Sequence, residues 1–375
     1  MFQATLNFYA GPGCLDSLVA ATGDLATMVV TDAGCRDAGL LDLILDALLP
    51  ARPVAIADFL AFEPTTSDVR QVASTITKTS PGCIVAVGGG SAIDLAKAAA
   101  AIAANGRGVR DYVNSSYADY TADALHADPI PVIAIPTTAG TGSEVTRNAA
   151  ITDSDTGEKL ALRSPRLVPR AQFLDPGLLR TCPPHVIAQS GLDAAAHALE
   201  GMMSTLASAG SDEIALDALR RLLTALPLFC REPADPGLAL QMQLGSLMAG
   251  AVLNDCATVT AHALARAMGG VSKLAHGLSV ALVLPETLRF NAAESADPLR
   301  RVAAALGLDQ QQPAESVAAA LEEMRESLGI PDRLRAAGIR ERDLAPIAAT
   351  ASAFTELNPR PAGAEELTEI LRTVF

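Results

Sequence analysis

The first half of the chain places short apolar runs, rich in β-branched residues, directly before stretches with helical spacing. The runs lie at 28–32, 83–90 and 131–144, and the helical stretches lie at 38–48 and 92–104. Strands that alternate with helices build a parallel sheet with helices on both of its faces. Each run leads into Gly, Asp or Thr, at the sheet edge where folds of this kind bind ligands. The alternation therefore predicts an α/β domain with a ligand site at the carboxyl ends of its strands.

The second half of the chain has a different pattern, in which apolar residues recur at helical spacing and strand signals almost vanish. Amphipathic helices are expected at 213–229 and 364–375. Proline and glycine residues interrupt the chain at 176–184. A length of 375 residues also favours two domains over one. We therefore expect a sheet domain over 1–180 and an all-helical domain over 181–375.

The charge and the cysteines argue against several classes of partner. The net charge is -14 and no dense run of Lys or Arg occurs, so the sequence carries no electrostatic footprint for nucleic acid or an anionic membrane. The six cysteines lie far apart without a CxxC pair, which indicates free thiols in a reducing compartment. The first residues lack the basic start and apolar stretch of a signal peptide. We expect a cytoplasmic protein that binds neither nucleic acid nor membranes.

A triple glycine follows the second apolar run and opens a helical stretch. Gly88, Gly89 and Gly90 would let the backbone approach a pyrophosphate closely, and the helix that follows would point unpaired N–H groups at it. Ser91 is expected as the N-cap, with Asp94 three residues further on, and both are predicted cofactor-binding residues. The alternative is an ordinary tight turn, because the segment is not the dinucleotide fingerprint GxGxxG. The form nevertheless favours a phosphate cradle.

A second loop with hydroxyl groups follows the third apolar run. Thr137, Thr138 and Thr141 could hydrogen-bond the amide or ribose of a nicotinamide cofactor, although a Gly/Thr turn alone would have the same composition. Asp32, at the end of the first run, could accept both hydroxyls of an adenosine ribose and would repel a 2′-phosphate. The aspartate favours NAD over NADP, while a solvated cap is the alternative.

Three of the five histidines fall in one downstream pattern with an aspartate. Asp193 and His197 are spaced i, i+4, so on a helix they project from one face and can share an ion. His262 would come from a second helix and His276 from a turn before a third. One carboxylate and three imidazoles suit Fe(II), with Zn as the alternative. Without further information, scattered structural histidines explain the pattern equally well.

Six motifs, in the right order along nearly the whole chain, together resemble those of the iron-containing (group III) alcohol dehydrogenases. The resemblance implies an N-terminal Rossmann-like domain and a C-terminal helical domain, the architecture shared with dehydroquinate synthase, with cofactor and metal in a cleft between them. The motifs are GGGSAIDLAKA at 88–98, PTTAGTGSEVT at 136–146, GLDAAAHALE at 191–200, HALARAMGG at 262–270, AHGLSVALVLPETLRFN at 275–291 and NPRP at 358–361.

The resemblance also assigns roles to individual positions. The metal ligands it implies are Asp193, His197, His262 and His276. The cofactor positions it implies are Gly89, Gly90 and Ser91 at the pyrophosphate, Thr137, Thr138 and Thr141 in the second loop, Lys159 at a ribose, and Asp32 as the NAD-selecting residue. Asn148 lies where members often carry an active-site polar residue.

One position departs from the family pattern. Four residues after His262, members typically have another histidine, thought to help relay protons, and this chain has Arg266. An arginine does not deprotonate in proteins, so it cannot relay a proton. Its guanidinium could instead pair with a carboxylate or phosphonate on the substrate. The simpler explanation of an arginine at this position is composition, because the chain has 24 Arg and only four Lys.

The function expected from these features is reversible hydride transfer between NAD(H) and a small alcohol or aldehyde, with Fe(II) or Zn as Lewis acid and a homodimer as the assembly. One alternative is a reductase of an anionic carbonyl substrate, anchored by Arg266. A more distant alternative is a sugar-phosphate enzyme similar to dehydroquinate synthase. A binding protein without turnover is the non-enzymatic alternative, and Arg266 is its only support.

Overall fold

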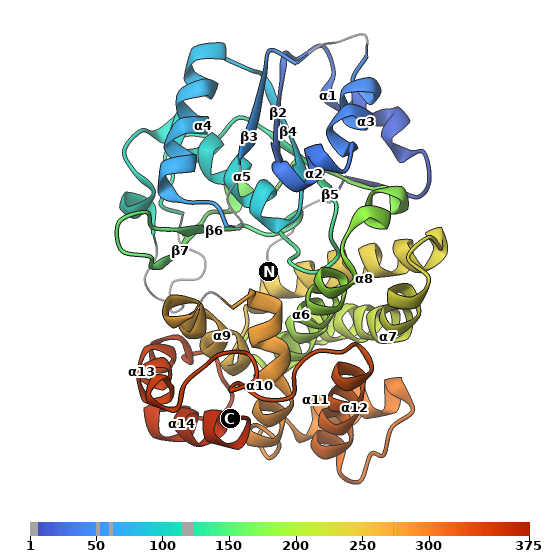
Figure 1. Cartoon of the computed structure of the whole chain (residues 1–375), viewed down its shortest axis with the longest axis vertical. Helices are drawn as coiled ribbons and strands as arrows, with labels where there is room; N and C mark the ends of the chain where they lie inside the picture. The colour runs from blue at the N-terminus through green and yellow to red at the C-terminus, as the bar shows by residue number, and fades with distance from the viewer. Residues whose placement is uncertain (1–6, 50–52, 60–62, 114–122, 273) are drawn as a thin grey trace. The chain divides into compact units, whose positions relative to one another are not determined.

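The computed structural model describes residues 7–49, 53–59, 63–113, 123–272 and 274–375 (Figure 1). The chain forms two compact units. The first consists of Met1–Cys182 together with Pro233–Gln243, and the second of Pro183–Glu232 together with Leu244–Phe375. Each unit has its own architecture and is described by itself.

The first unit contains a parallel sheet of six strands in the order β1-β8-β5-β4-β2-β3. Its central strands β2, β4 and β5 have buried side chains almost throughout, as expected for parallel strands covered on both faces. The sheet confirms the predicted fold class. Its strands are β1 (Phe8–Ala10), β2 (Thr27–Asp32), β3 (Ala55–Phe59), β4 (Cys83–Gly88), β5 (Val132–Pro136) and β8 (Ala171–Leu174).

Alternating side chains of the central strands pack into two cores, one on each face of the sheet. Ile84 and Ala86 contribute to the core that includes helices α4 (Thr66–Thr79) and α5 (Gly90–Asn105). Val85 and Val87 point to the opposite core, with α3 (Leu40–Ala47). The short helices α1 (Leu18–Thr22) and α2 (Ala33–Asp37) also belong to this unit, as does the start of α8 (Pro236–Cys256) (Figure 1).

Two details of this unit differ from the expectation or were absent from it. Helix α5 begins at Gly90 with Gly89 as its N-cap and without a side-chain cap, so the predicted cap at Ser91 is wrong. Gly89 adopts the extended N-cap conformation, so the helix begins directly after it, at Gly90. In addition, an antiparallel hairpin of β6 (Asn148–Thr152) and β7 (Lys159–Arg163) follows the second loop.

The second unit is built from helices, and its described residues contain no strand. Helix α6 packs against α7 and α10, and α9 packs against α10 and α13. The helix predicted at 213–229 is confirmed within α7, and the helix predicted at 364–375 is confirmed as α14, which ends two residues earlier. The helices that lie wholly in this unit are α6 (Pro184–Met203), α7 (Ala209–Arg231), α9 (Thr260–Val271), α10 (His276–Phe290), α11 (Ala296–Leu306), α12 (Pro313–Ser327), α13 (Glu341–Ala351) and α14 (Ala364–Thr373).

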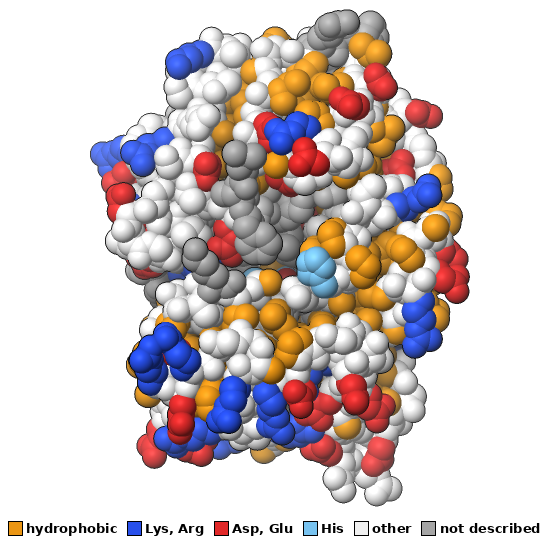
Figure 2. Space-filling model, viewed as in Figure 1, with side chains coloured by type: hydrophobic (Ala, Val, Ile, Leu, Met, Phe, Trp, Pro, Cys, Tyr) orange, Lys and Arg blue, Asp and Glu red, His pale blue; other side chains and the backbone are white. Residues whose placement is uncertain are grey.

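Helix α8 (Pro236–Cys256) is the one described helix that is long and apolar enough to cross a membrane, judged by length and composition. Half of its most apolar stretch is buried inside the protein, and core helices of soluble proteins have the same composition. On the face drawn in Figure 2, basic and acidic side chains lie interspersed.

Candidate active site

Three helices of the second unit carry the four predicted metal ligands. Helix α6 carries Asp193 and His197 one turn apart, and both side chains are buried. Helix α9 carries His262 in its first turn, and α10 begins at His276. His276 is the most exposed of these residues, with 45% of its side chain accessible. The four residues therefore lie on packed helices, which fix their backbones.

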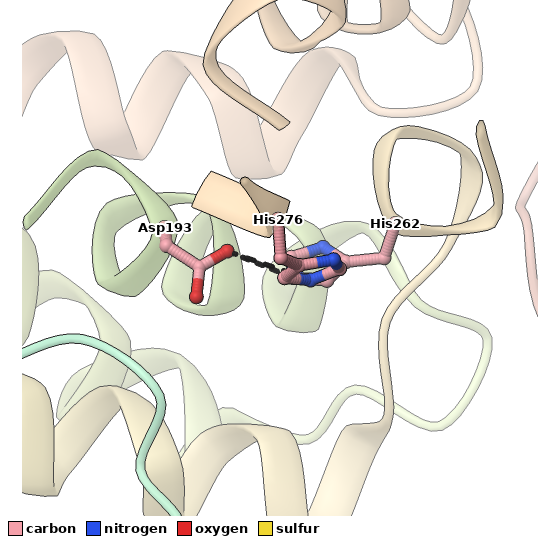
Figure 3. Close-up of side chains that lie close together, drawn as sticks. All are labelled: Asp193, His262 and His276. Carbon is pink, nitrogen blue, oxygen red and sulfur yellow. Dashed lines mark ion pairs between the residues drawn. The ribbon is translucent and has the colours of Figure 1, made fainter. Parts of the chain in front are cut away.

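The side chains of Asp193, His262 and His276 converge on one point (Figure 3). Asp193 Oδ1 lies 3.5 Å from His262 Nε2 and 3.7 Å from His276 Nε2. Neither distance suits a strong hydrogen bond. An ion held tetrahedrally at about 2.1 Å from each ligand would separate the ligand atoms by about 3.4 Å. The spacing and the donor set therefore fit a divalent metal ion.

His197 lies beside this group, and its ring stacks on the ring of His262 with 4.5 Å between centroids. The cluster of ligand atoms within 4.8 Å of one another includes the other three residues and leaves His197 out. Its role as fourth ligand stays a prediction.

Glu200 is a member of this centre that the sequence analysis missed. It is fully buried on α6, and its Oε2 lies 2.5 Å from His262 Nδ1. Its Oε1 accepts a hydrogen bond from the backbone N–H of Ala261 at 2.5 Å. A carboxylate at Nδ1 holds the proton there and leaves the Nε2 lone pair for a metal. The signal was present in the sequence, because Asp193, His197 and Glu200 follow the spacing i, i+4, i+7 along one helix face.

The charges of the centre are coupled. Burial disfavours a charged His262, but the carboxylates of Glu200 and Asp193 outweigh burial and raise its pKa to about 10. Burial likewise opposes ionisation of Asp193, yet the imidazoles of His197, His276 and His262 hold its pKa well below the usual range. The centre therefore attracts a cation, and a metal that binds there displaces a proton.

The two predicted catalytic residues lie in different units. Arg266 is one turn after His262 on α9, and its guanidinium carbon lies 4.1 Å from the ring centre of Phe354. This distance is typical of a cation–π contact. Asn148 begins β6 in the first unit, and its buried Oδ1 has no hydrogen-bond partner among the described residues. Such an unsatisfied acceptor is unusual in a protein interior.

The predicted cofactor loops lie at the carboxyl ends of β2, β4 and β5, which are neighbours in the sheet. A Cβ added to Gly88 would lie 2.6 Å from Asp32 Oδ2, and a Cβ added to Gly90 would lie 2.6 Å from Thr141 Oγ1. A Cβ on Gly89 would touch Thr138 at 3.4 Å. The glycines thus let Asp32 and the threonine loop come close to the start of α5.

Hydrogen bonds reinforce this contact between the loops. The backbone N–H of Thr137 donates to Gly88 O at 3.0 Å. Asp32 caps α2 by accepting from the N–H of Cys35 at 2.9 Å. The structure therefore brings the predicted NAD-selecting aspartate, the glycine turn and the threonine loop together.

Two predicted cofactor residues are engaged with other side chains. Lys159 forms an ion pair with Glu63. Asp94 points into the protein, where its Oδ2 accepts from the N–H of Ala150 at 2.9 Å and its Oδ1 lies 3.6 Å from Lys97 Nζ. This geometry argues against a direct contact between Asp94 and a cofactor.

Comparison with known proteins agrees with this arrangement. The iron-containing alcohol dehydrogenase family matches residues 6–176, and the C-terminal part of that family matches residues 187–375. The chain is 30% identical over 363 residues to the NAD-dependent methanol dehydrogenase of Bacillus methanolicus, covering 94% of this chain and 93% of that protein. It is 34% identical over 325 residues to the 4-hydroxybutyrate dehydrogenase of Cupriavidus necator, covering 84% and 82%.

The fold agrees as well. The crystal structure of a 1,3-propanediol oxidoreductase superposes with a TM-score of 0.92 at 28% identity, over the full length of both chains. The family matches cover both halves of the chain. The chain belongs to the iron-containing alcohol dehydrogenase family.

Proposed function

We propose that this protein is a metal-dependent oxidoreductase that transfers a hydride between NAD(H) and a small alcohol or aldehyde. The observation that carries the proposal is the convergence of Asp193, His262 and His276 within 4.8 Å of one another. One carboxylate and imidazoles suit Fe(II) or Zn better than Mg or Ca, which prefer oxygen ligands. His197 is the proposed fourth ligand.

When bound, the ion would act as a Lewis acid on the oxygen of the substrate, and the nicotinamide would supply or accept the hydride. Glu200 keeps His262 in the tautomer that leaves Nε2 available. The residues proposed to hold the cofactor are Asp32, Gly88, Gly89, Gly90, Ser91, Thr137, Thr138, Thr141 and Lys159. Asp32 supports NAD over NADP.

A second candidate is reduction of an anionic carbonyl compound. Arg266 lies one turn from His262, and Phe354 supports its guanidinium plane. A planar fork on the helix that carries His262 suits a carboxylate or phosphonate on the substrate. The similarity to a 4-hydroxybutyrate dehydrogenase, whose named substrate carries a carboxylate, supports the same idea.

The test is NADH consumption by Fe(II)-loaded protein with aldehydes of matched length, one neutral and one with a terminal carboxylate. We compare wild type, Arg266→Ala and Arg266→Lys, with Arg300→Ala as a control for losing a surface arginine. Loss of activity confined to the carboxylate substrate in Arg266→Ala supports the anionic candidate. Equal rates with both aldehydes and little effect of the substitution support the neutral alcohol dehydrogenase. No NADH consumption with any carbonyl compound contradicts the proposed function.

Matches of the alcohol dehydrogenase family to both halves of the chain favour this proposal over a sugar-phosphate enzyme. The cytoplasmic location and the homodimer stay predictions, and light scattering on purified protein measures the assembly. The domain assignment also stays a proposal: a nucleotide-binding domain over 1–180 and a metal-binding domain over 181–375.

A further inference from the structure

The amide of Asn358 joins three segments of the second unit. Asn358 opens the motif NPRP at 358–361 and is buried. Its Oδ1 accepts from Thr260 Oγ1 at 2.6 Å and from Asn291 Nδ2 at 3.0 Å. Its Nδ2 donates to Asn291 Oδ1 at 2.8 Å and to Arg360 O at 2.7 Å. An amide can form four such bonds, and all four are made here. A buried polar group that is fully satisfied fixes the groups that it joins.

The three segments are the start of α9, the end of α10 and the connection between α13 and α14. Thr260 is the first residue of α9, and Asn291 directly follows α10 as its C-cap. Arg360 adds two contacts to the end of α10. Its Nη1 donates to Phe290 O at 2.8 Å, and its guanidinium carbon lies 4.1 Å from the ring centre of Phe290. The motif therefore ties the connection to both helices that carry predicted metal-binding histidines other than the one on α6.

The start of α9 depends on partners from outside the helix. Val259, its N-cap, provides no side-chain hydrogen bond to the helix, and the first N–H groups of any helix lack partners within it. Ala257, two residues before Val259, has a φ of 58°, a left-handed conformation that is strained for alanine and persists only where the surroundings hold it. Ser204 Oγ supplies one such contact by donating to Cys256 O at 2.6 Å. The chain that enters α9 is thus held by other segments.

Asn358 and Glu200 hold the same turn of α9. Glu200 accepts from the N–H of Ala261 and contacts His262 Nδ1, while Asn358 holds Thr260, the residue before Ala261. A metal site functions only when its ligand atoms lie within about 0.5 Å of their productive positions. Two anchors on adjacent residues restrain both the position and the rotation of the turn, which one anchor alone would not. The placement of His262 therefore depends on both contacts.

We propose that Asn358 is a positioning residue for the metal centre, because through Thr260 it holds the first turn of α9 and with it His262. The inference rests on the proposed function, in which His262 binds the metal. Without the bond to Thr260 the turn can shift, and binding of the ion must then supply the order that the hydrogen bond supplies now. A purely structural role is distinguishable. Thr260 lies two residues from His262, whereas Asn291 lies at the opposite end of α10 from His276.

The test compares removal of the bond to Thr260 with removal of the bonds to Asn291. Thr260→Val removes the hydroxyl and preserves the shape of the side chain, and Thr260→Ser keeps the hydroxyl. Asn291→Ala is the matched control, because it removes both bonds between the two amides, far from the ligand on α10. Affinity for Zn is measured by competition with a fluorescent chelator, and the visible absorption of bound Co(II) reports the geometry of the ligands. Thermal unfolding of the metal-free proteins gives the Tm.

We expect Thr260→Val to weaken Zn binding about three- to tenfold, the usual net contribution of one hydrogen bond, and to change the Co(II) absorption. Thr260→Ser should bind Zn within about twofold of wild type. Asn291→Ala should lower the Tm, because two buried hydrogen bonds are lost, yet leave Zn affinity within about twofold. Adding Thr260→Val to Asn358→Ala should weaken Zn binding no further, because both remove the same bond. Thr260→Ala provides the comparison if Thr260→Val does not fold.

Zn binding by Thr260→Val that stays within about twofold of wild type would overturn the positioning role. Equal weakening in Thr260→Val and Asn291→Ala would overturn it as well, since it would show a general loss of stability in the second unit. A wild-type protein that binds neither Zn nor Co(II) would instead overturn the proposed function, and the inference with it.

Discussion

Replacing Glu200 by glutamine changes one buried oxygen of the metal centre into an NH₂ group and preserves its shape. In one amide orientation, the new oxygen accepts from the N–H of Ala261 and the NH₂ faces His262 Nδ1. His262 must then accept at Nδ1 and carry its proton on Nε2, where the metal would bind. In the other orientation, two donors face each other at Ala261. Either way one of the two hydrogen bonds is lost once a metal occupies Nε2 of His262.

The magnitude follows from these two contacts, each 2.5 Å long in a fully buried environment. A buried polar group left without its partner costs about 1 to 3 kcal/mol. At about 1.4 kcal/mol per factor of ten, the loss corresponds to roughly 5- to 150-fold weaker metal binding. Measured substitutions of carboxylates behind metal-binding histidines fall in a similar range of about 10- to 100-fold.

The assay is competition for Zn with a fluorescent chelator at fixed pH, which reports affinity without requiring turnover. The control is Glu322→Gln, because Glu322 pairs with Arg289 in the same unit and is not part of the metal centre. Thermal unfolding of the metal-free proteins verifies that Glu200→Gln is folded. If Glu200→Gln binds Zn within threefold of wild type, Glu200 does not control the tautomer of His262, and the argument fails.

Three further predictions concern other buried contacts. Burial raises the pKa of Glu144 from 4.5 to about 7. Protonation of Glu144 therefore contributes fully to the free energy of unfolding below pH 4.5. This contribution, about 3 kcal/mol in all, is lost as pH rises through 7. In urea unfolding, the free energy of unfolding of Glu144→Gln should fall less than that of wild type across this pH range. Parallel plots of this free energy against pH for the two proteins would contradict the prediction. Gly90→Ala should weaken NADH binding by about 1 to 3 kcal/mol through overlap with Thr141, and a loss that Thr141→Ala does not reduce would contradict the overlap. Asn358→Ala should lower the free energy of unfolding by about 2 to 4 kcal/mol, because Thr260 and Asn291 lose a buried partner; a loss under about 1 kcal/mol would argue against it.

The parts of the fold that follow from local pattern could be predicted. Strands β2, β4 and β5 are continuous apolar runs. At or just after their carboxyl ends, where a ligand site was expected, lie Asp32, Gly88 and Thr137. Parallel strands end at one edge of a sheet, so this juxtaposition depends on topology alone. The hairpin over 148–163 was missed because its first strand, NAAIT, carries little β-branched or alternating signal.

The pairings of buried charges could not be predicted, because they join residues far apart in the sequence. Glu200 meets His262 62 positions later, and Lys97 meets Ser143 46 positions later. The pairing of Lys159 with Glu63 spans 96 positions. No periodicity records such contacts, since they arise only when helices and loops pack. The sequence names the residue types, and tertiary structure selects their partners.

The metal centre illustrates how packing creates a site. Helix α6 supplies Asp193 and, two turns later, Glu200, while α9 supplies His262 and the N–H of Ala261. Glu200 therefore holds the first turn of α9 through one oxygen and orients the ring of His262 through the other. The ligands cannot converge until α6, α9 and α10 have packed, so the unfolded chain offers no comparable site. Metal binding must then stabilise the helical unit, by about 2.7 kcal/mol when free metal is a hundredfold above its Kd. The residues that prepare the site for chemistry are thus also contacts that fix its helices.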